Sequence, residues 1–405
     1  MDTIGAFRLA YQGHHITNAA QSSIGSTLRR GLTAVLPVWL SLLAISLAWG
    51  VTMQILPGYM EGEQFYPTNW AANLAHFDPH SYLVVAEQGY DAGESSVRFP
   101  LFPFLLRLVI TATGADGHLA LFWLSKVSLL IGLLAVWLVV RHQIDEDLAR
   151  RAVLYMAFPL LGSGYTWLMS YAEPLHLALW VFGFLLFFQR RYALCGLITM
   201  LTMWTRPQAA FQIPAFAAAL TIDALRAGGW RALLDRDYWQ RGLLICGLPL
   251  LAYSAWMLHI SSLTQLPLSP VTTVQAYGRL DWLAPWVRIL ERVRFLAAHP
   301  PVDAGWTMLF EDYQLFVALA SLVALFIAAA RGRLHWGLVL FSALSILPGL
   351  STAVTSIGRY ALLTWIPLAP LAIIPRRWDS AVLPFSLALS FLALVVIGLV
   401  KGLQP

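Results

Sequence analysis

Apolar runs of about twenty residues recur along the whole chain, and the charged residues fall in short clusters between them. A helix needs a run of this length to cross the hydrocarbon core of a bilayer. Of the 405 residues, 59% are hydrophobic and only 12% are charged, which is typical of a polytopic membrane protein. No stretch is left over for a separate soluble domain of ordinary size. We therefore expect an all-α polytopic fold, with residues 1–405 forming a single membrane-embedded domain.

The apolar runs predict roughly eleven membrane helices, at about 34–56, 117–140, 152–167, 173–189, 192–205, 208–222, 242–260, 313–330, 336–351, 360–374 and 381–400. The run at 99–114 is shorter, has two prolines near its start and carries Arg107 in its middle, so we predict an interfacial helix there. Counting it as a span would place the pair Arg150 and Arg151 on the outer face, against the positive-inside bias.

With the N-terminus in the cytoplasm, sixteen of the 26 basic residues fall in inside loops. The net charge of +5 is thus explained by orientation, and a nucleic-acid partner is not expected. Two large loops then face the outside, at about 57–116 and 261–312. The second contains Trp282–Pro300, whose apolar residues have helical spacing and alternate with arginines, so it is predicted to lie on the membrane surface.

The segment HFDPHSYLVVAEQGY lies in the first outer loop. Asp78 followed by Pro79 has the form of a helix start, and Gly89 would end that helix. Asp78 either serves only as a cap or is a fixed, ionised carboxylate that also accepts a proton. His76 and His80 flank it, but their spacing around a helix start does not make a regular zinc pair, so no metal site is predicted.

Further polar residues are predicted at the outer ends of helices. They are Tyr171 and Glu173 in SYAEPLH, Arg206 in WTRPQ and Arg359 in SIGRY, with Arg98 beside the first loop. Charges at membrane edges are costly unless they are paired or functional, so these residues are candidates for one outer cavity. The alternative is that Glu173 pairs with an arginine only to hold helices together. Lys126 lies within a predicted span, where we expect it to meet an acidic partner.

Five motifs occur in a recognisable order: FDPHSYLVVAEQGY, RFPLFPFLL, YAEPLHLAL, TRPQA and SIGRYALLTWIPL. Over about 34–375 the chain resembles the PIG-V-type mannosyltransferases, the family that includes GPI mannosyltransferase II, within the GT-C class of glycosyltransferases. The resemblance implies a GT-C-like bundle that transfers mannose, with inversion, from polyprenyl- or dolichyl-phosphate-mannose to a glycolipid or glycan acceptor. The reaction would take place at the outer face of a bacterial plasma membrane or the lumenal face of the endoplasmic reticulum.

The resemblance also implies the roles of individual residues. The acid of the first outer loop matches Asp78, which would be the general base, and the Phe-Pro-Leu-Phe-Pro segment matches Phe99–Pro103. Arg206 and Arg359, with Arg98, would stabilise the phosphate leaving group. The remaining candidates for substrate binding are Tyr171, Glu173, His80, Tyr82 and Tyr360. Phe77 stands where the family often has tryptophan, and Pro79 follows the acid, so the acceptor stays open.

This interpretation requires no cofactor. A monophosphate leaving group needs a divalent metal less than a diphosphate does, and metal dependence stays open. Three alternatives remain. The chain could use another lipid-phosphate sugar, such as glucose or arabinose. It could be a lipid transporter, although polar residues gather at the outer edge rather than at mid-membrane. It could also be a scaffold subunit without catalysis.

Overall fold

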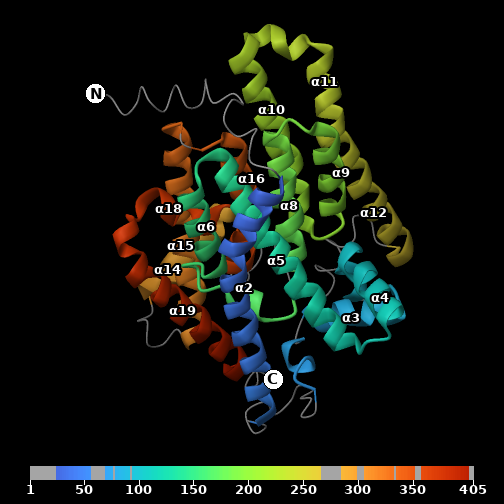
Figure 1. Ribbon diagram of the computed structural model, residues 1–405, viewed down its shortest axis with the longest axis vertical. Coiled ribbons are helices and arrows are strands. Elements are labelled where there is room, and N and C mark those ends of the chain that lie inside the picture. The colour runs from blue at the N-terminus through green and yellow to red at the C-terminus, as the bar shows by residue number, and fades with distance from the viewer. Residues whose placement is uncertain are drawn as a thin grey trace.

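The computed structural model describes residues 24–55, 69–75, 78–91, 94–265, 284–298, 305–332, 334–351 and 357–400. Every element within these ranges is helical (Figure 1). The α-helices are α2 (Ile24–Ile55), α3 (Asp78–Gln88), α4 (Leu101–Thr113), α5 (Gly117–Gln143), α6 (Glu146–Ala157), α7 (Tyr165–Leu168), α8 (Glu173–Phe188), α9 (Tyr192–Met203), α10 (Gln212–Gly228), α11 (Arg236–Gly242), α12 (Leu248–Thr264), α14 (Pro285–Ala298), α15 (Gly305–Ala330), α16 (Trp336–Ser351), α17 (Ile357–Leu362), α18 (Pro370–Ile373) and α19 (Asp379–Val400).

Short 3-10 or π turns connect several of these helices: η2 (Ala72–Leu74), η3 (Glu94–Val97), η4 (Pro207–Phe211), η5 (Gly229–Leu234), η6 (Leu243–Gly247), η9 (Ile366–Leu368) and η10 (Arg376–Trp378).

The chain is a helical membrane protein, as its apolar runs predict. Five helical segments among the described residues are long and apolar enough to cross a bilayer: Gly25–Gln54, Gly117–Gln143, Pro207–Leu234, Arg236–Thr264 and Leu309–Ala330. Four shorter apolar helices accompany them, namely α4, α8, α9 and α16. The predicted number of about eleven membrane helices is therefore not confirmed.

Two of the predicted spans are divided in the structure, and prolines lie near the breaks. The prediction of one helix over 152–167 was wrong, because α6 ends at Ala157 and helical structure resumes only with the single turn α7. Phe158 precedes Pro159, and a residue before proline avoids the helical region. The predicted helix 360–374 is likewise divided among α17, η9 and α18, with prolines at or near the start of the last two.

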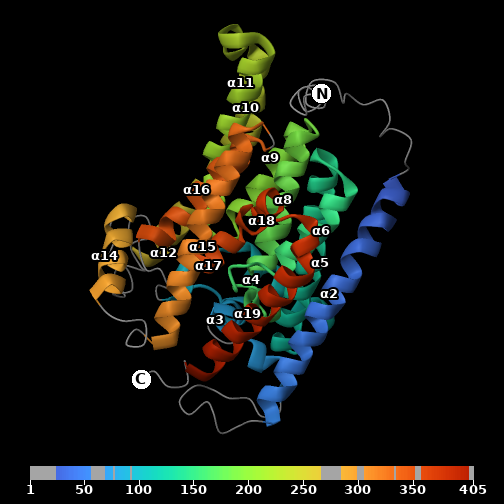
Figure 2. The same cartoon turned by 90° about the vertical axis from the view of Figure 1, so that its left-hand side faces the viewer.

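The centre of the bundle is α5, which packs against α8, α6 and α2. Trp137, Trp167 and Trp180 are fully buried in this core. Helices at the outside of the bundle, such as α2 in Figure 2, expose large apolar side chains, including Leu40 at 52%. Such exposure suits a surface that faces lipid rather than water.

The two ends of the bundle carry different elements. Figure 2 shows the N-terminal end of α2 and the tip formed by α10 and α11 at one end, with α3 toward the other. The helix α4 begins after Pro100 and ends at Gly114, whose φ of 66° is left-handed, as at many helix ends. Thirteen residues rise only about 20 Å, less than the hydrocarbon core, so α4 agrees with the predicted short helix at 99–114. The helix predicted within Trp282–Pro300 corresponds to α14, and its position on the membrane surface stays a prediction.

Candidate active site

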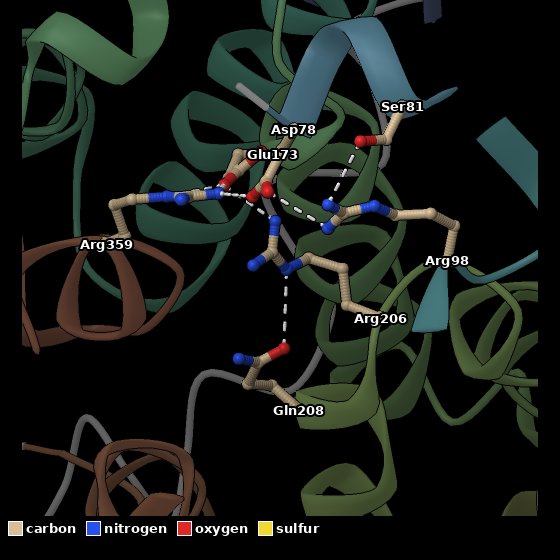
Figure 3. A network of polar contacts seen from close by, with 7 residues as sticks. All are labelled: Asp78, Ser81, Arg98, Glu173, Arg206, Gln208 and Arg359. Atoms are coloured by element: carbon tan, nitrogen blue, oxygen red, sulfur yellow. Dashed lines mark hydrogen bonds and ion pairs between the residues drawn. The ribbon is translucent and has the colours of Figure 1, made fainter. Parts of the chain in front are cut away.

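Three arginines and two carboxylates from distant parts of the sequence meet in one cluster, which we call the arginine–carboxylate cluster (Figure 3). The carboxylates are Asp78 at the start of α3 and Glu173 at the start of α8. The arginines are Arg98 after η3, Arg206 before η4 and Arg359 in α17. Both acids lie in the first turn of a helix, where the positive end of the helix dipole favours a negative charge.

Asp78 is held by two guanidinium groups, one on each carboxylate oxygen. Arg359 Nη2 donates to Asp78 Oδ2 at 2.6 Å, and Arg98 Nη1 lies 3.0 Å from Asp78 Oδ1. Burial alone would raise the pKa of this carboxyl group, but the charges of Arg359 and Arg98 outweigh it and hold the pKa well below its usual value. The Asp78 side chain keeps 24% of its surface exposed, so the carboxylate can be reached by a bound molecule.

Glu173 is completely buried and is shared by two arginines. Arg206 Nη1 lies 2.6 Å from Glu173 Oε1, and Arg359 donates to the same oxygen through Nε at 3.0 Å and through Nη2. The other oxygen, Oε2, has no hydrogen-bond partner among the described residues. Since Glu173 has no exposed surface, its geometry suits the holding of Arg206 and Arg359 rather than contact with a substrate.

The local sequence explains how Arg206 reaches the cluster. It precedes Pro207 and has extended backbone angles, φ −161° and ψ 156°, as expected for a residue before proline. This directs the chain out of the end of α9 and into η4. Arg206 Nε donates to Gln208 Oε1 at 3.3 Å, and Thr205 Oγ1 lies 2.6 Å from Nδ1 of the buried His176.

Two aromatic rings complete the setting of the arginines. The guanidinium carbon of Arg359 lies 4.6 Å from the ring centroid of Tyr171, and that of Arg98 lies 5.5 Å from the ring centroid of Tyr82. Both tyrosines are buried. Cation–π contacts of this kind restrict a guanidinium without neutralising it.

Two backbone hydrogen bonds tie the contributing segments together. The amide of Leu101, three residues after Arg98, donates to the carbonyl of Trp204 at 2.8 Å. The amide of Ser170, just before Tyr171, donates to the carbonyl of Leu74 at 3.0 Å. The first loop is therefore fixed to the chain on both sides of the cluster.

The cluster has one positive charge in excess when its three guanidiniums and two carboxylates are in their usual states. An isolated charge is unfavourable in a partly buried site. A bound anion would remove the imbalance, and arginine forks match the oxygens of a phosphate or carboxylate.

The other predicted site residues lie around this cluster without joining its ion pairs. His80 is exposed on α3, and the ring of Tyr360 packs against Gly349 of α16. His76 and Phe77 lie outside the described residues. Two members of the network were missed from the sequence, Ser81, which accepts a hydrogen bond from Arg98 at 3.3 Å, and Gln208. Their positions, three residues after Asp78 and two after Arg206, were the available signal.

The donor set does not fit a divalent cation. Within the part of the chain that the structure describes, no group of three His, Cys, Asp or Glu side chains could hold a metal. Both carboxylates of the cluster are already bound by guanidiniums, and the surplus charge is positive.

No protein-family model matches the chain, and no curated protein matches it. Among solved structures it is similar to the oligosaccharyltransferase of the archaeon Archaeoglobus fulgidus tethered to an acceptor peptide containing the NVT sequon. The identity is 12%, the TM-score is 0.44, and the match covers 90% of this chain and 54% of that one. A second structure is the archaeal oligosaccharyltransferase AglB from the same organism with an inhibitory peptide and a dolichol-phosphate, at 11% identity, TM-score 0.43 and the same coverages.

The chain thus spans about half the length of these neighbours. Values this low describe a loose likeness between helical arrangements.

Glu173→Gln is expected to lower the free energy of unfolding by on the order of 3 kcal/mol, because it leaves two largely buried guanidiniums without their shared counter-charge. Denaturant or thermal unfolding in detergent measures the change. Asp237→Asn is the matched control: it removes a surface ion pair with Arg241, worth between zero and about 1 kcal/mol. Equal effects of the two variants would contradict the holding role of Glu173.

Proposed function

We propose that this chain is an inverting glycosyltransferase. It moves mannose from a polyprenyl- or dolichyl-phosphate-mannose donor to a hydroxyl group of a glycolipid or glycan acceptor, at the outer face of a membrane that it crosses several times. The single observation that carries the proposal is the cluster in which Arg98, Arg206 and Arg359 surround Asp78 and Glu173 with one positive charge in excess.

The arginines suit the phosphate of such a donor. A lipid-phosphate sugar keeps its tail in the bilayer, so its phosphate stays near the level of the headgroups. Arg98 and Arg359 contact the partly exposed Asp78, and Arg206 contacts the buried Glu173. Hydrogen-bond donors that are already oriented before the reaction stabilise the negative charge that grows on the leaving phosphate, and they need no reorganisation to do so.

Asp78 supplies the base. The acceptor hydroxyl attacks the anomeric carbon from the face opposite the phosphate, and a new carbon–oxygen bond forms there. The bond between the anomeric carbon and the phosphate oxygen breaks, and its electron pair stays on the phosphate. The hydroxyl proton passes to the Asp78 carboxylate. One displacement inverts the anomeric centre, and no covalent intermediate with the protein is needed.

Because Asp78 is paired with Arg359 and Arg98, binding of the sugar donor changes how strong a base Asp78 is. A carboxylate whose pKa is held far below its usual value is a weak base. When the donor phosphate draws Arg359 and Arg98 toward itself, their hold on Asp78 weakens and the pKa of the carboxyl group rises. Asp78 thus becomes an effective base only when the donor is in place.

This coupling predicts the pH dependence of transfer. In the free protein the lowered pKa keeps Asp78 ionised, so kcat/KM has no acid limb from this group above about pH 5. In the donor complex the pKa is higher, so the acid limb of kcat lies at higher pH than that of kcat/KM. Initial rates across pH at low and saturating donor measure both limbs. An acid limb of kcat/KM at or above that of kcat contradicts the coupling.

Mannose as the sugar rests on the resemblance carried by the five ordered motifs, and a donor panel tests it. The purified protein in liposomes is given polyprenyl-phosphate-linked mannose, glucose or arabinose with a mixed lipid and glycan acceptor pool. We expect transfer from the mannose donor to exceed the others. Faster transfer from the glucose or arabinose donor would support glycosyltransferase activity but contradict mannose as the sugar transferred. Binding of lipid phosphate without transfer from any donor would favour the transporter alternative.

A further inference from the structure

Lysine is almost absent from this chain. Of the 26 basic residues, 24 are arginines and only Lys126 and Lys401 are lysines. Lys401 lies outside the described residues, and Lys126 is fully buried in α5. A single buried lysine in a chain that otherwise uses arginine indicates a site where the shape of the ammonium group matters.

The ammonium group of Lys126 is enclosed by backbone carbonyls. Its Nζ donates to the carbonyl oxygens of Trp167 at 2.5 Å, Leu168 at 2.8 Å and Met169 at 3.1 Å. The ring centroid of Phe122, one turn earlier in α5, lies 5.3 Å away. We call this arrangement the carbonyl cage. The expectation of an acidic partner for Lys126 is not met within the part of the chain that the structure describes, where the three partners are backbone carbonyls.

The cage fits an ammonium and not a guanidinium. Lysine has three donors on one compact atom, and three carbonyl oxygens satisfy all of them. Arginine would bring five donors on a wide planar group into a position with no exposed surface. Buried donors without partners are costly, which explains the lysine.

The three carbonyls belong to the end of α7 and the residue that follows it. The last carbonyls of a helix have no partners inside the helix and form the negative end of its dipole, so a cation stabilises them. The chain then continues to Ser170, whose amide donates to the carbonyl of Leu74 in the first loop. Tyr171 and Glu173 follow, and both contact the guanidinium of Arg359. On the other side, Trp39 of α2 donates to the carbonyl of Lys126 at 2.7 Å.

We propose that Lys126 is a positioning residue for the arginine–carboxylate cluster. Its ammonium fixes the turn at 167–169 and thereby sets Tyr171 and Glu173, which hold Arg359 and Arg206. The effect on phosphate binding rests on the proposed function, whereas the fixing of the turn does not.

Lys126→Met tests the proposal in the full-length protein in lipid nanodiscs. Without the ammonium, three buried carbonyls lose their donors and the turn loosens. Hydrogen exchange of peptides covering 167–173 is expected to become about tenfold faster or more. The dissociation constant for farnesyl phosphate, a lipid monophosphate probe, is expected to rise about tenfold. The thermal midpoint is measured alongside.

Two controls separate positioning from general loss of stability. Ser125→Ala changes the neighbouring buried residue, whose hydroxyl has no partner among the described residues, and should leave exchange and affinity unchanged. Arg151→Met removes a two-bond ion pair to Asp379, at 2.7 and 2.8 Å, that contacts no member of the cluster. It should lower the thermal midpoint without changing exchange at 167–173 or the affinity.

The outcomes decide the proposal. Unchanged exchange in Lys126→Met, or the same changes in Arg151→Met, would overturn it, and so would faster exchange with unchanged affinity. If Lys126→Met does not accumulate, Lys126→Gln takes its place, because its amide keeps two hydrogen-bond donors. It is expected to show smaller changes in exchange and affinity in the same direction. Exchange and affinity equal to those of the wild type in Lys126→Gln would overturn the proposal. If the wild type does not bind farnesyl phosphate while exchange still rises in the variant, the proposed function fails and the fixing of the turn stands.

Discussion

Asp78→Asn is expected to lower the rate of mannosyl transfer by about three orders of magnitude, within the range found for loss of a general base. The amide keeps the size of the side chain and its place at the start of α3, but it cannot take the acceptor's proton. Binding of lipid phosphate should persist or strengthen, because a negative charge that competes for Arg359 and Arg98 is gone. Initial rates with a radiolabelled donor, together with binding of farnesyl phosphate, measure both effects.

Glu87→Gln is the matched control for Asp78→Asn, since it makes the same chemical change at an exposed position of the same helix. Its rate should equal that of the wild type. A transfer rate of Asp78→Asn within a few-fold of the wild-type rate would contradict the role of Asp78 as the general base. In that case the carboxylate would serve only as a helix cap and as a partner for the arginines.

Arg359→Lys is expected to weaken the binding of lipid phosphate by about tenfold or more and to lower the transfer rate by about two orders of magnitude. Arg359 bonds to Asp78 and Glu173 at once through its guanidinium fork and stacks on Tyr171. An ammonium keeps the charge but cannot reproduce that geometry. Titration with farnesyl phosphate and initial-rate kinetics measure the two losses.

Arg107→Lys provides the control, because Arg107 is exposed on α4 and makes no contact with the cluster among the described residues. Its affinity and rate should stay at the wild-type level. If Arg359→Lys also had the wild-type affinity and transfer rate, a positive charge alone would suffice at this position. The geometry of the guanidinium would then have no role.

Parts of the fold could be predicted because they depend on local sequence. The Asp-Pro pair and Gly89 predicted a helix that α3 matches, running from Asp78 to Gln88. The short run at 99–114 similarly predicted α4. Each of these elements begins and ends at residues with strong backbone preferences.

The predicted spans failed where prolines interrupt long apolar runs. Hydropathy averages over a window, so it does not register that α6 ends at Ala157, just before Phe158 and Pro159. It likewise misses the end of α17 at Leu362, after which helical structure resumes in η9 and then in α18, which begins at Pro370. Counting apolar runs therefore joined short helices that the structure separates.

The candidate site was predicted as a set of residues but not as a network. The sequence indicated that Asp78, Glu173, Arg206 and Arg359 lie at helix ends near one face. It could not tell that one arginine bridges both acids, because that depends on how α3, α8 and α17 pack. Lys126 shows the same limit, since backbone carbonyl acceptors have no signature in the sequence.

A structure of the full chain with a lipid monophosphate bound tests the central claim most directly. We expect the phosphate to lie within hydrogen-bond distance of Arg359 and at least one of Arg206 and Arg98, with Asp78 beside the place that the anomeric carbon of a donor would occupy. We also expect at least one guanidinium to have moved from Asp78 toward the phosphate. A phosphate bound farther than one side chain's length from Arg206 and Arg359 would contradict the claim.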